Sequence, residues 1–273
     1  MAHPWRRPPG GEAAIMGVLN CTPDSFSDGG RYLDPDRAAA HGVAMWRAGA
    51  RLIDVGGESS RPGAEPVAVE EELARVVPVV ERLCAAGCRV SIDSRKPEVM
   101  RAAIAAGASM INDITALGAD GALELAASSS VDICLMHMQG TPQTMQRDPR
   151  YHSVVDEVIA WLQQRVARCA AAGIARSRLV VDPGIGFGKR PEHNWALLRA
   201  VGRIREELGL PVLIGISRKS LLAPLVEGPP ERRDMVSALA AMGPLLAGCD
   251  ILRVHDVALH RQAAAIAARL TPC

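Results

Sequence analysis

The chain has 273 residues, which is long for an ordinary domain and typical of a single α/β barrel. Its 31 Lys and Arg residues and 30 Asp and Glu residues leave a formal net charge of +1, so the overall charge gives no support to a dedicated nucleic-acid or membrane-surface binder. Hydrophobic residues make up 48% of the chain and aromatic residues only 3%, which excludes global disorder and indicates an aliphatic core.

The first twelve residues are rich in Pro and Gly and contain no apolar segment, so we expect residues 1–12 to form a loose tail and not a secretory signal. The seven cysteines are odd in number and include no C-x-x-C pair, which is typical of reduced thiols in a cytoplasmic protein. No apolar run approaches the roughly 20 residues that a membrane-spanning helix needs. We therefore expect a cytoplasmic protein with no membrane partner and no nucleic-acid partner.

From residue 13 onward, short aliphatic runs alternate with longer segments of helical period. The predicted strands are 15–19, 51–55, 89–92, 109–111, 132–136, 179–181, 211–214 and 251–254, and several are apolar on both faces, as buried parallel strands are. The predicted helices include 34–48, 69–86, 96–106, 151–172, 192–208, 234–247 and 258–270, and four of them are closed by Gly49, Gly87, Gly107 and Gly173.

About eight βα units without a break in composition predict an α/β fold, a single (β/α)8 TIM barrel over residues 13–273. An open, doubly wound sheet could use the same alternation. The regular count and the lack of a dinucleotide-binding fingerprint favour the barrel.

Almost every predicted strand ends in a polar residue that a Gly- or Pro-rich loop follows. In chain order these residues are Asn20, Asp54, Asp93, Asn112 with Asp113, His137, Asp182, Ser217, and Arg253 with His255. The carboxyl ends of all strands in a barrel meet at one rim, where barrel enzymes have their active sites. Any one Asp or Asn could equally cap the next helix. The whole set predicts an active site at the C-terminal ends of the strands.

Two basic groups are expected at the end of the barrel. Arg253 and His255 are two positions apart on a strand, so their side chains should point the same way, and the pair suits an oxyanion such as phosphate. The alternative is an arginine salt-bridged across the rim and a hydrogen-bonded core histidine. The segment 217–220, Ser-Arg-Lys-Ser, suits an anion or a carbonyl group, although a basic pair alone is usually a solvated surface.

Both phenylalanines of the chain, Phe26 and Phe187, lie in predicted rim loops. In a chain so poor in aromatic residues, this position favours stacking on a flat ligand, although Phe26 could equally anchor its loop. The loop DPGIGFGK at 182–189 matches neither G-x-G-x-x-G nor G-x-x-x-x-G-K-[ST]. Its glycines could serve the approach of a ligand or a tight turn.

Eight segments that run in order from about residue 15 to about residue 260 resemble the dihydropteroate synthase family. They are MGVLNCTPDSFSDGG (16–30), DVGGESSRPGA (54–64), SIDSRKPEV (91–99), MINDI (110–114), LMHMQGTP (135–142), DPGIGFGK (182–189), GISRKS (215–220) and RVHDV (253–257). The departures are small. Ser60 stands where the family commonly has Thr, Ser94-Arg95 replaces a frequent Thr-Ser pair, and Ile185 replaces a common Phe or Leu.

The resemblance implies a homodimeric barrel transferase of folate biosynthesis. Such an enzyme joins 6-hydroxymethyl-7,8-dihydropterin diphosphate to p-aminobenzoate, and it releases 7,8-dihydropteroate and diphosphate. The resemblance also implies a requirement for Mg²⁺, a dissociative (SN1-like) mechanism, and sulfonamides that compete as mimics of p-aminobenzoate.

The same resemblance implies roles for individual residues. Pterin is expected on Asp93, Asn112, Met138, Asp182, Phe187 and Lys219, and diphosphate on Asn20, Ser60, Arg253 and His255, with Asn20 also binding the metal. Phe26, Arg61, Pro62 and Ser220 are expected around p-aminobenzoate, and Asp93, Lys219, Arg253 and His255 are the expected catalytic residues. Carboxylates and an amide suit the N–H donors and acceptors of a pterin edge. We further hypothesise that loops 21–31 and 57–66 become ordered only when the diphosphate binds.

Two other functions stay open at this point. A pterin-binding methyltransferase of the same barrel type, acting on methyl-tetrahydrofolate with a corrinoid partner, could share Asp93, Asn112 and Asp182. It would have no need for Arg253, His255 or a metal ligand at Asn20. A catalytically silent paralogue that binds pterin without condensing it is the third possibility.

Overall fold

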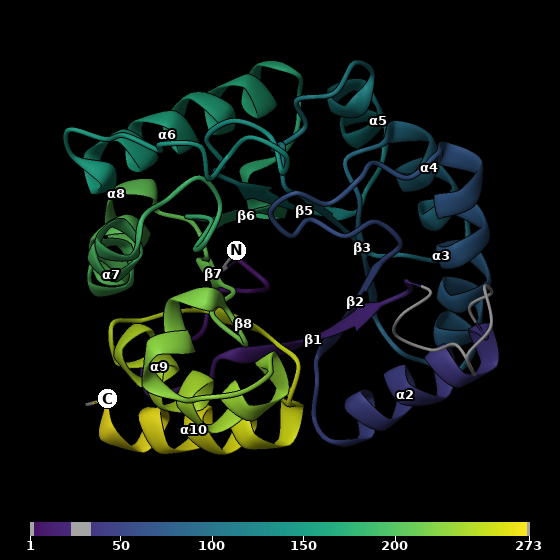
Figure 1. The fold of residues 1–273 in the computed structure, drawn as a ribbon. Helices are drawn as coiled ribbons and strands as arrows, with labels where there is room; N and C mark the ends of the chain where they lie inside the picture. The colour runs from purple at the N-terminus through teal and green to yellow at the C-terminus, as the bar shows by residue number, and fades with distance from the viewer. Residues whose placement is uncertain (1–2, 23–33, 272–273) are drawn as a thin grey trace.

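Eight parallel strands form the centre of the computed structural model, which describes residues 3–22 and 34–271 (Figure 1). The strands are β1 (Ala14–Asn20), β2 (Leu52–Gly56), β3 (Val90–Asp93), β4 (Met110–Asp113), β5 (Asp132–Met136), β6 (Leu179–Asp182), β7 (Leu213–Ile214) and β8 (Ile251–Val254). Their order in the sheet is β6-β5-β4-β3-β2-β1-β8-β7. A parallel bridge between Val181 and Val212 joins β6 to the segment before β7 and brings the two edges together. The predicted (β/α)8 barrel is confirmed.

Helices connect the strands and lie outside the ring (Figure 1). They are α2 (Pro35–Arg47), α3 (Val69–Ala85), α4 (Pro97–Ala105), α5 (Ala122–Ser128), α6 (Val154–Ala171), α7 (Pro191–Arg199), α8 (Val201–Leu208), α9 (Asp234–Leu246) and α10 (Val257–Leu270), with short 3₁₀ turns η1 (Arg176–Arg178), η2 (Ser220–Leu225) and η3 (Pro230–Arg233). Each strand is followed by at least one helix before the next strand begins. No helix of the described residues is both long and apolar enough to cross a membrane.

One predicted helix is wrong in its extent. The segment 192–208 was expected to form a single helix, but it forms α7 and α8, which meet at Ala200. The N–H of Ala200 is shared between the carbonyl groups of Ala196 and Leu197, as in the tightened last turn of a helix. Both helices bury leucines, Leu197 in α7 and Leu208 in α8.

The helix ends follow local chemistry that the sequence already indicates. The Asp34 carboxylate accepts hydrogen bonds from the N–H groups of Asp36 and Arg37 and caps the start of α2. Gly49, Gly87, Gly107 and Gly173 follow the ends of α2, α3, α4 and α6, and all four have positive φ angles. These are the glycines predicted to close the helices, and an L side chain would be strained there.

The buried side chains form two clusters. The larger cluster packs between the strands and the surrounding helices. The smaller one fills the inside of the barrel and consists of Trp5, Met16, Leu52, Met110, Cys134, Val180, Leu213 and Ile251. All but Trp5 come from the strands, one from each of seven strands. The core is therefore aliphatic, as the composition predicts.

The expectation of a loose tail is wrong for residues 3–12. Trp5 is 5% exposed, its Nε1 donates a 2.7 Å hydrogen bond to Asp132, and the Arg89 guanidinium lies 4.7 Å from its ring centroid. The N–H of Arg7 donates to Asp250 at 2.9 Å. Asp132, Arg89 and Asp250 stand at or just before the starts of three strands, so this segment closes the end of the barrel opposite to the strand carboxyl ends. A buried tryptophan in the barrel provides the apolar contact that holds it there.

Candidate active site

Four polar side chains from four different strands meet at the carboxyl ends of the barrel strands. Arg253 of β8 donates to Asp54 of β2 from Nε at 2.6 Å and to Asp93 of β3 from Nη2 at 2.6 Å. The amide nitrogen of Asn112 in β4 donates to the same Asp54 oxygen at 3.0 Å. The fold thus joins residues that lie up to 199 positions apart in the sequence.

The carboxylates of this cluster are poorly solvated. Asp54 is fully buried, and its Oδ1 has no hydrogen-bond partner among the residues that the structure describes. Burial raises the pKa of Asp93 to about 7, with Asp54 adding to the shift and Arg253 opposing it. A buried acceptor without a partner is costly unless a ligand N–H satisfies it. This cluster therefore has the hydrogen-bonding deficit expected of a binding site for a group rich in N–H donors.

The sequence predicts Asp54 at the end of a strand, but we assigned it no role in the site. Its position inside the DVGGES segment was the available signal. Arg253 has the cross-rim salt bridge that we gave as the alternative, and His255 has a hydrogen bond, its Nδ1 lying 3.0 Å from the Ser217 hydroxyl. Burial, reinforced by Arg218 and Arg253, lowers the pKa of His255 to about 3. The imidazole is therefore neutral near pH 7.

The loop after β6 is bent around Asp182. Asp182 Oδ1 accepts a 2.7 Å hydrogen bond from the N–H of Gly184, and burial raises the pKa of this carboxyl. Gly184, Gly186 and Gly188 have φ angles of 71°, 83° and 61°. A Cβ at Gly184 would lie 1.9 Å from the carbonyl oxygen of His137. Of the two roles left open for these glycines, the left-handed φ angles support the tight turn, and the Gly184 contact shows in addition that the turn packs closely against the segment after β5.

Lys219 and Phe187 form one side of the same region. The Lys219 ammonium lies 4.1 Å from the Phe187 ring centroid and donates to the Ile185 carbonyl at 2.6 Å. Burial lowers the pKa of Lys219 to about 8, although Asp182 works in the opposite direction. Phe187 is half-buried. The predicted pterin residues 182, 187 and 219 thus belong to one contiguous group.

Lys189 is a buried group that the sequence did not single out. It is 3% exposed, and its ammonium donates to the carbonyl oxygens of Gly184 and Phe187, each at 2.9 Å, and lies 3.0 Å from Nδ1 of His137. Burial lowers the pKa of Lys189 to about 7. The side chain ties the loop after β6 to the end of β5. Only its place at the end of the DPGIGFGK segment could have pointed to it.

The other predicted site residues lie around this rim, except for one. Asn20 at the end of β1, Ser60 and Met138 are half-buried, whereas Arg61, Pro62 and Ser220 are exposed. Phe26 lies outside the described residues, as does most of loop 21–31, so the hypothesis that this loop and loop 57–66 order on diphosphate binding stays a prediction. Cys21 next to Asn20 is buried, and burial raises the pKa of its thiol to about 12, so it acts as a packing residue.

The carboxylate of Asp113 closes the turn that directly follows β4, and it does not cap the next helix, because α5 begins only at Ala122. It accepts hydrogen bonds from the Thr115 N–H, the Thr115 hydroxyl and the Leu117 N–H. Its oxygens are therefore used within its own turn, while Asn112 beside it faces Asp54.

The donor set suits Mg²⁺ only together with a substrate. Within residues 3–22 and 34–271, no three His, Cys, Asp or Glu side chains are grouped so that they could hold a metal ion. The Asn20 amide offers one hard oxygen ligand. Mg²⁺ characteristically takes one or two protein oxygens and completes its shell with water and substrate phosphate oxygens. Asn20 fits that pattern.

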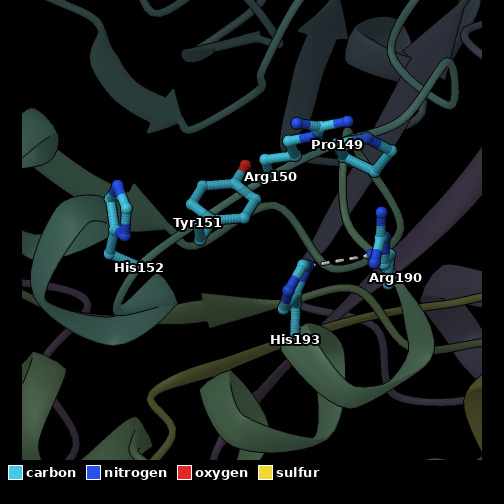
Figure 2. A pocket seen from close by; sticks show the side chains of 6 residues that line it. All are labelled: Pro149, Arg150, Tyr151, His152, Arg190 and His193. Atoms are coloured by element: carbon cyan, nitrogen blue, oxygen red, sulfur yellow. Dashed lines mark hydrogen bonds between the residues drawn. The ribbon is translucent and has the colours of Figure 1, made fainter.

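Two cavities of the described chain lie outside this cluster. One of about 550 Å³ is lined by Pro149, Arg150, Tyr151, His152, Arg190 and His193, and Figure 2 shows the His193 ring accepting from the Arg190 backbone beside the Tyr151 ring. The other, of about 480 Å³, is lined by Arg95, Lys96, Pro97, Thr115, Gly118 and Ala119. Neither is lined by a predicted site residue, so the polar cluster and not a cavity locates the candidate site.

Comparison with known proteins identifies the family of the chain. The family described as pterin binding enzyme matches residues 16–255. The chain is 48% identical to the dihydropteroate synthase of Escherichia coli (strain K12) over 244 residues, which cover 89% of this chain and 86% of that protein. Among solved structures, the Yersinia pestis dihydropteroate synthase with a sulfonamide drug complex has a TM-score of 0.90 at 45% identity, covering 95% of this chain and 94% of that one. The Xanthomonas albilineans dihydropteroate synthase with 4-aminobenzoic acid has a TM-score of 0.89 at 46% identity, covering 98% and 95%.

Proposed function

The chain belongs to the pterin-binding enzyme family and, within it, to the dihydropteroate synthases, which are transferases. From this membership we propose that the chain catalyses the condensation that gives the family its name. It joins 6-hydroxymethyl-7,8-dihydropterin diphosphate to p-aminobenzoate and releases 7,8-dihydropteroate and diphosphate. The observation that carries the proposal is the cluster of Asp54, Asp93, Asn112 and Arg253. In it, one guanidinium pairs with the buried Asp54 and the half-buried Asp93, and the Asn112 amide donates to Asp54. It combines acceptors for a pterin edge with a cation for a departing polyanion.

Pterin binding follows from the acceptors of the cluster. The N–H groups of an amino-pyrimidinone edge are donors for Asp93 and Asp182, and the Asn112 amide can donate and accept. Lys219 supplies donors toward the pterin carbonyl, while Met138 and Phe187 are the apolar walls. A pterin N–H beside Asp93 favours its ionised form and offsets the cost of burial. A substrate without these donors would leave buried acceptors unpaired, at a cost of about 1–3 kcal/mol each.

Diphosphate binding needs donors that remain free when the carboxylates are paired. The bonds to Asp54 and Asp93 use two of the five N–H donors that a guanidinium has, so Arg253 can hold both carboxylates and still donate to phosphate oxygens. His255, Ser60 and Asn20 are the further contacts. Mg²⁺ held by Asn20 and the diphosphate would neutralise part of the leaving group's charge.

The bond-breaking step requires no strong protein base. The carbon that loses diphosphate is conjugated to an electron-rich ring, which stabilises positive charge on it, and the p-aminobenzoate amine then attacks that carbon and loses a proton. The neutral His255 and the thiol of Cys21, whose pKa burial raises, support this dissociative course, since neither is an activated nucleophile. Phe26, Arg61, Pro62 and Ser220 would hold p-aminobenzoate or a sulfonamide in its place.

We also propose a homodimer and a cytoplasmic location. Exposed apolar side chains gather on η2, α9 and α10: Leu225, Met235, Leu239, Leu246, Ile266 and Leu270. Leu239 is 63% exposed. Exposed apolar groups on neighbouring helices are typical of a surface that another protein covers, and a second copy of this chain is the partner that the family membership favours.

The deciding experiment is a diphosphate-release assay with the pterin diphosphate and p-aminobenzoate, with and without Mg²⁺. We expect release that requires both substrates and is strongly reduced when the metal is chelated. Binding of the pterin diphosphate without release would instead identify a silent pterin-binding protein. Methyl transfer from methyl-tetrahydrofolate to a corrinoid protein would identify the methyltransferase.

Arg253→Ala tests the central cation. We expect kcat/KM to fall about 10²–10³-fold, as it does when one donor to a developing oxyanion is removed. The matched control is Arg269→Ala on the exposed surface of α10, which should keep wild-type turnover. Arg253→Ala also removes the cation that two carboxylates share, so its effect could include a loss of folding. Arg253→Lys is therefore the second variant: it keeps the charge and should retain the fold with reduced activity. Wild-type turnover in both Arg253 variants would exclude the assigned role.

A further inference from the structure

The two ends of the loop between β2 and α3 are joined by Glu58. We call this junction, formed by Glu58 and Val67, the loop neck. One Glu58 carboxylate oxygen, Oε2, accepts a 2.8 Å hydrogen bond from the backbone N–H of Val67, nine residues further along the chain. The other, Oε1, accepts from Arg95 Nε at 2.9 Å. The Arg75 guanidinium donates to the Gly57 carbonyl at 2.7 Å, next to Glu58. The two ends of the loop are therefore tied to each other and to the loop after β3.

Lys96 makes this link a buried network. Its ammonium donates to Glu58 Oε2 at 2.8 Å, to the Val67 carbonyl at 2.6 Å and to Glu72 Oε2 at 2.5 Å. The Glu72 side chain is fully buried, and those of Glu58 and Lys96 are 12% and 16% exposed. Although burial works in the opposite direction, the hydrogen bonds from Lys96, Val67 and Arg95 hold the pKa of Glu58 below its usual value. Charge-assisted hydrogen bonds with so little water around them are stronger than exposed surface pairs.

The part of the loop beyond the neck carries residues assigned to p-aminobenzoate and diphosphate. Ser60 and the exposed Arg61 and Pro62 follow Glu58 within four positions. The tip of the loop also lies against the segment after β5, where the Gly63 N–H donates to the Pro142 carbonyl and Gln143 donates to the Ala64 carbonyl, each at 3.1 Å. The neck thus fixes the position of the backbone that carries Ser60, Arg61 and Pro62.

We propose that Glu58 is a positioning residue for p-aminobenzoate. By joining Val67, Arg95 and Lys96, it holds the loop neck closed, so that Ser60, Arg61 and Pro62 are presented to the mouth of the barrel before p-aminobenzoate arrives. The inference rests on the proposed function. A preorganised loop loses less conformational freedom on binding, so its benefit lies in the affinity for the substrate that it contacts.

Glu58→Gln is the first test, because it removes the charge and keeps the shape. We expect faster amide hydrogen exchange over residues 58–68 and a KM for p-aminobenzoate raised about ten-fold, as loss of one charge-assisted hydrogen bond would give. The kcat should change less than about two-fold, because the pterin cluster is not part of the neck. The KM for the pterin diphosphate should rise less than the KM for p-aminobenzoate, because Ser60 is only one of several residues assigned to the diphosphate. The matched control is Glu98→Gln, the same charge change on the exposed start of α4.

Two further variants separate the hydrogen bonds of Glu58 from its negative charge. Glu58→Asp keeps the charge but is one methylene shorter, so it should behave like Glu58→Gln, and wild-type kinetics in Glu58→Asp would overturn the proposal. Arg95→Gln removes one of the bonds and should give an intermediate KM, which keeps the test open if Glu58→Gln does not fold. Unchanged exchange, or faster exchange with an unchanged KM for p-aminobenzoate, also overturns it. If the wild type released no diphosphate, the proposed function would fail. The exchange experiment would still test the loop neck, because it does not depend on turnover.

Discussion

Single side chains at the mouth of the barrel owe their protonation states to the small amount of water that reaches them. His137 is 6% exposed, it lies edge-on to the Trp161 ring at 5.0 Å, and its Nδ1 faces the Lys189 ammonium. Burial, followed by the charge of Lys189, lowers the pKa of His137 to about 3. The imidazole is thus neutral and can accept the hydrogen bond from Lys189.

The His137 pair predicts a loss of stability in acid. Below about pH 6.5 the unfolded chain binds a proton on this histidine, whereas the folded protein does not until about pH 3. The unfolded state therefore holds more protons in this window, and the folded state loses stability as the pH falls through it. We expect His137 to account for about 2 kcal/mol of lost unfolding free energy between pH 6.5 and 4.5.

Urea unfolding at these two pH values checks the prediction. His137→Gln should lose less stability on acidification than the wild type, whatever its stability at pH 6.5. His152→Gln, at an exposed histidine, is the control and should follow the wild type. Equal pH slopes in the wild type and His137→Gln would contradict the assignment.

At the scale of elements, the loop after β6 is shaped by close backbone contacts. Gly184 and Gly188 adopt left-handed conformations and approach the segment after β5, and the Lys189 ammonium bonds both Gly184 in the loop and His137 in that segment. The loop carries Asp182 at its start and Phe187 near its end. A change in its path would therefore move two of the residues assigned to pterin.

Gly184→Ala is expected to disrupt this loop. A Cβ would lie 1.9 Å from the His137 carbonyl oxygen, so the backbone must move. We expect a loss of stability of more than about 2 kcal/mol and a pterin affinity reduced at least about ten-fold. Gly173→Ala is the matched control. Its φ of 83° is similarly left-handed, but nothing lies within 4 Å of the added carbon, so it should cost only about 1–2 kcal/mol.

Urea unfolding and calorimetric titration with the pterin diphosphate give the two quantities. If Gly184→Ala and Gly173→Ala lose equal stability and both keep the wild-type affinity, the contact with the β5 segment has no role in shaping the loop.

At the scale of the whole molecule, one end of the barrel carries the candidate site and the other end is closed by the N-terminal segment. Arg253 joins β8 to β2 and β3 at the carboxyl end and leaves polar groups for a ligand. The segment of residues 3–12 closes the other end with Trp5. Helices α9 and α10 pack against each other on one side of the ring and bear exposed apolar side chains (Figure 1).

Trp5→Ala should destabilise the protein without impairing the site. The indole fills the barrel interior and bonds Asp132, so its loss should lower the unfolding free energy by about 3–5 kcal/mol. Turnover at low temperature should stay near wild type, since Trp5 lies at the opposite end from the site. The exposed Glu12→Ala is the control, and denaturant unfolding is the measurement. A loss no greater than that of Glu12→Ala would mean that the segment adds little stability.

Leu239→Glu tests the proposed homodimer. A carboxylate in the middle of the apolar surface of α9 would have to be buried on association, at a cost of several kcal/mol. We expect a wild-type dimer and a predominantly monomeric variant in sedimentation velocity. Arg101→Glu, on the exposed surface of α4, should stay dimeric. A monomeric wild type, or an unaltered dimer in Leu239→Glu, would exclude this surface.

The barrel and the set of strand-end residues could be predicted from the sequence, because they depend on local patterns. Alternation of aliphatic runs with helical segments fixes the order of elements, and glycines such as Gly49 and Gly107 mark helix ends through their own backbone freedom. The family motifs then point to the reaction. None of this requires knowing which distant residues touch.

The tertiary structure alone decided the contacts between segments far apart in the chain. These include the pairing of Arg253 with Asp93, 160 residues away, the buried placement of Lys189, the packing of Trp5 into the barrel and the closure of the loop neck by Glu58. Each depends on the direction of a side chain after the ring has closed and on the water excluded there. The sequence around a charged or aromatic residue specifies neither the direction of its side chain nor its exposure to water, because both are set only when the other strands and loops surround it.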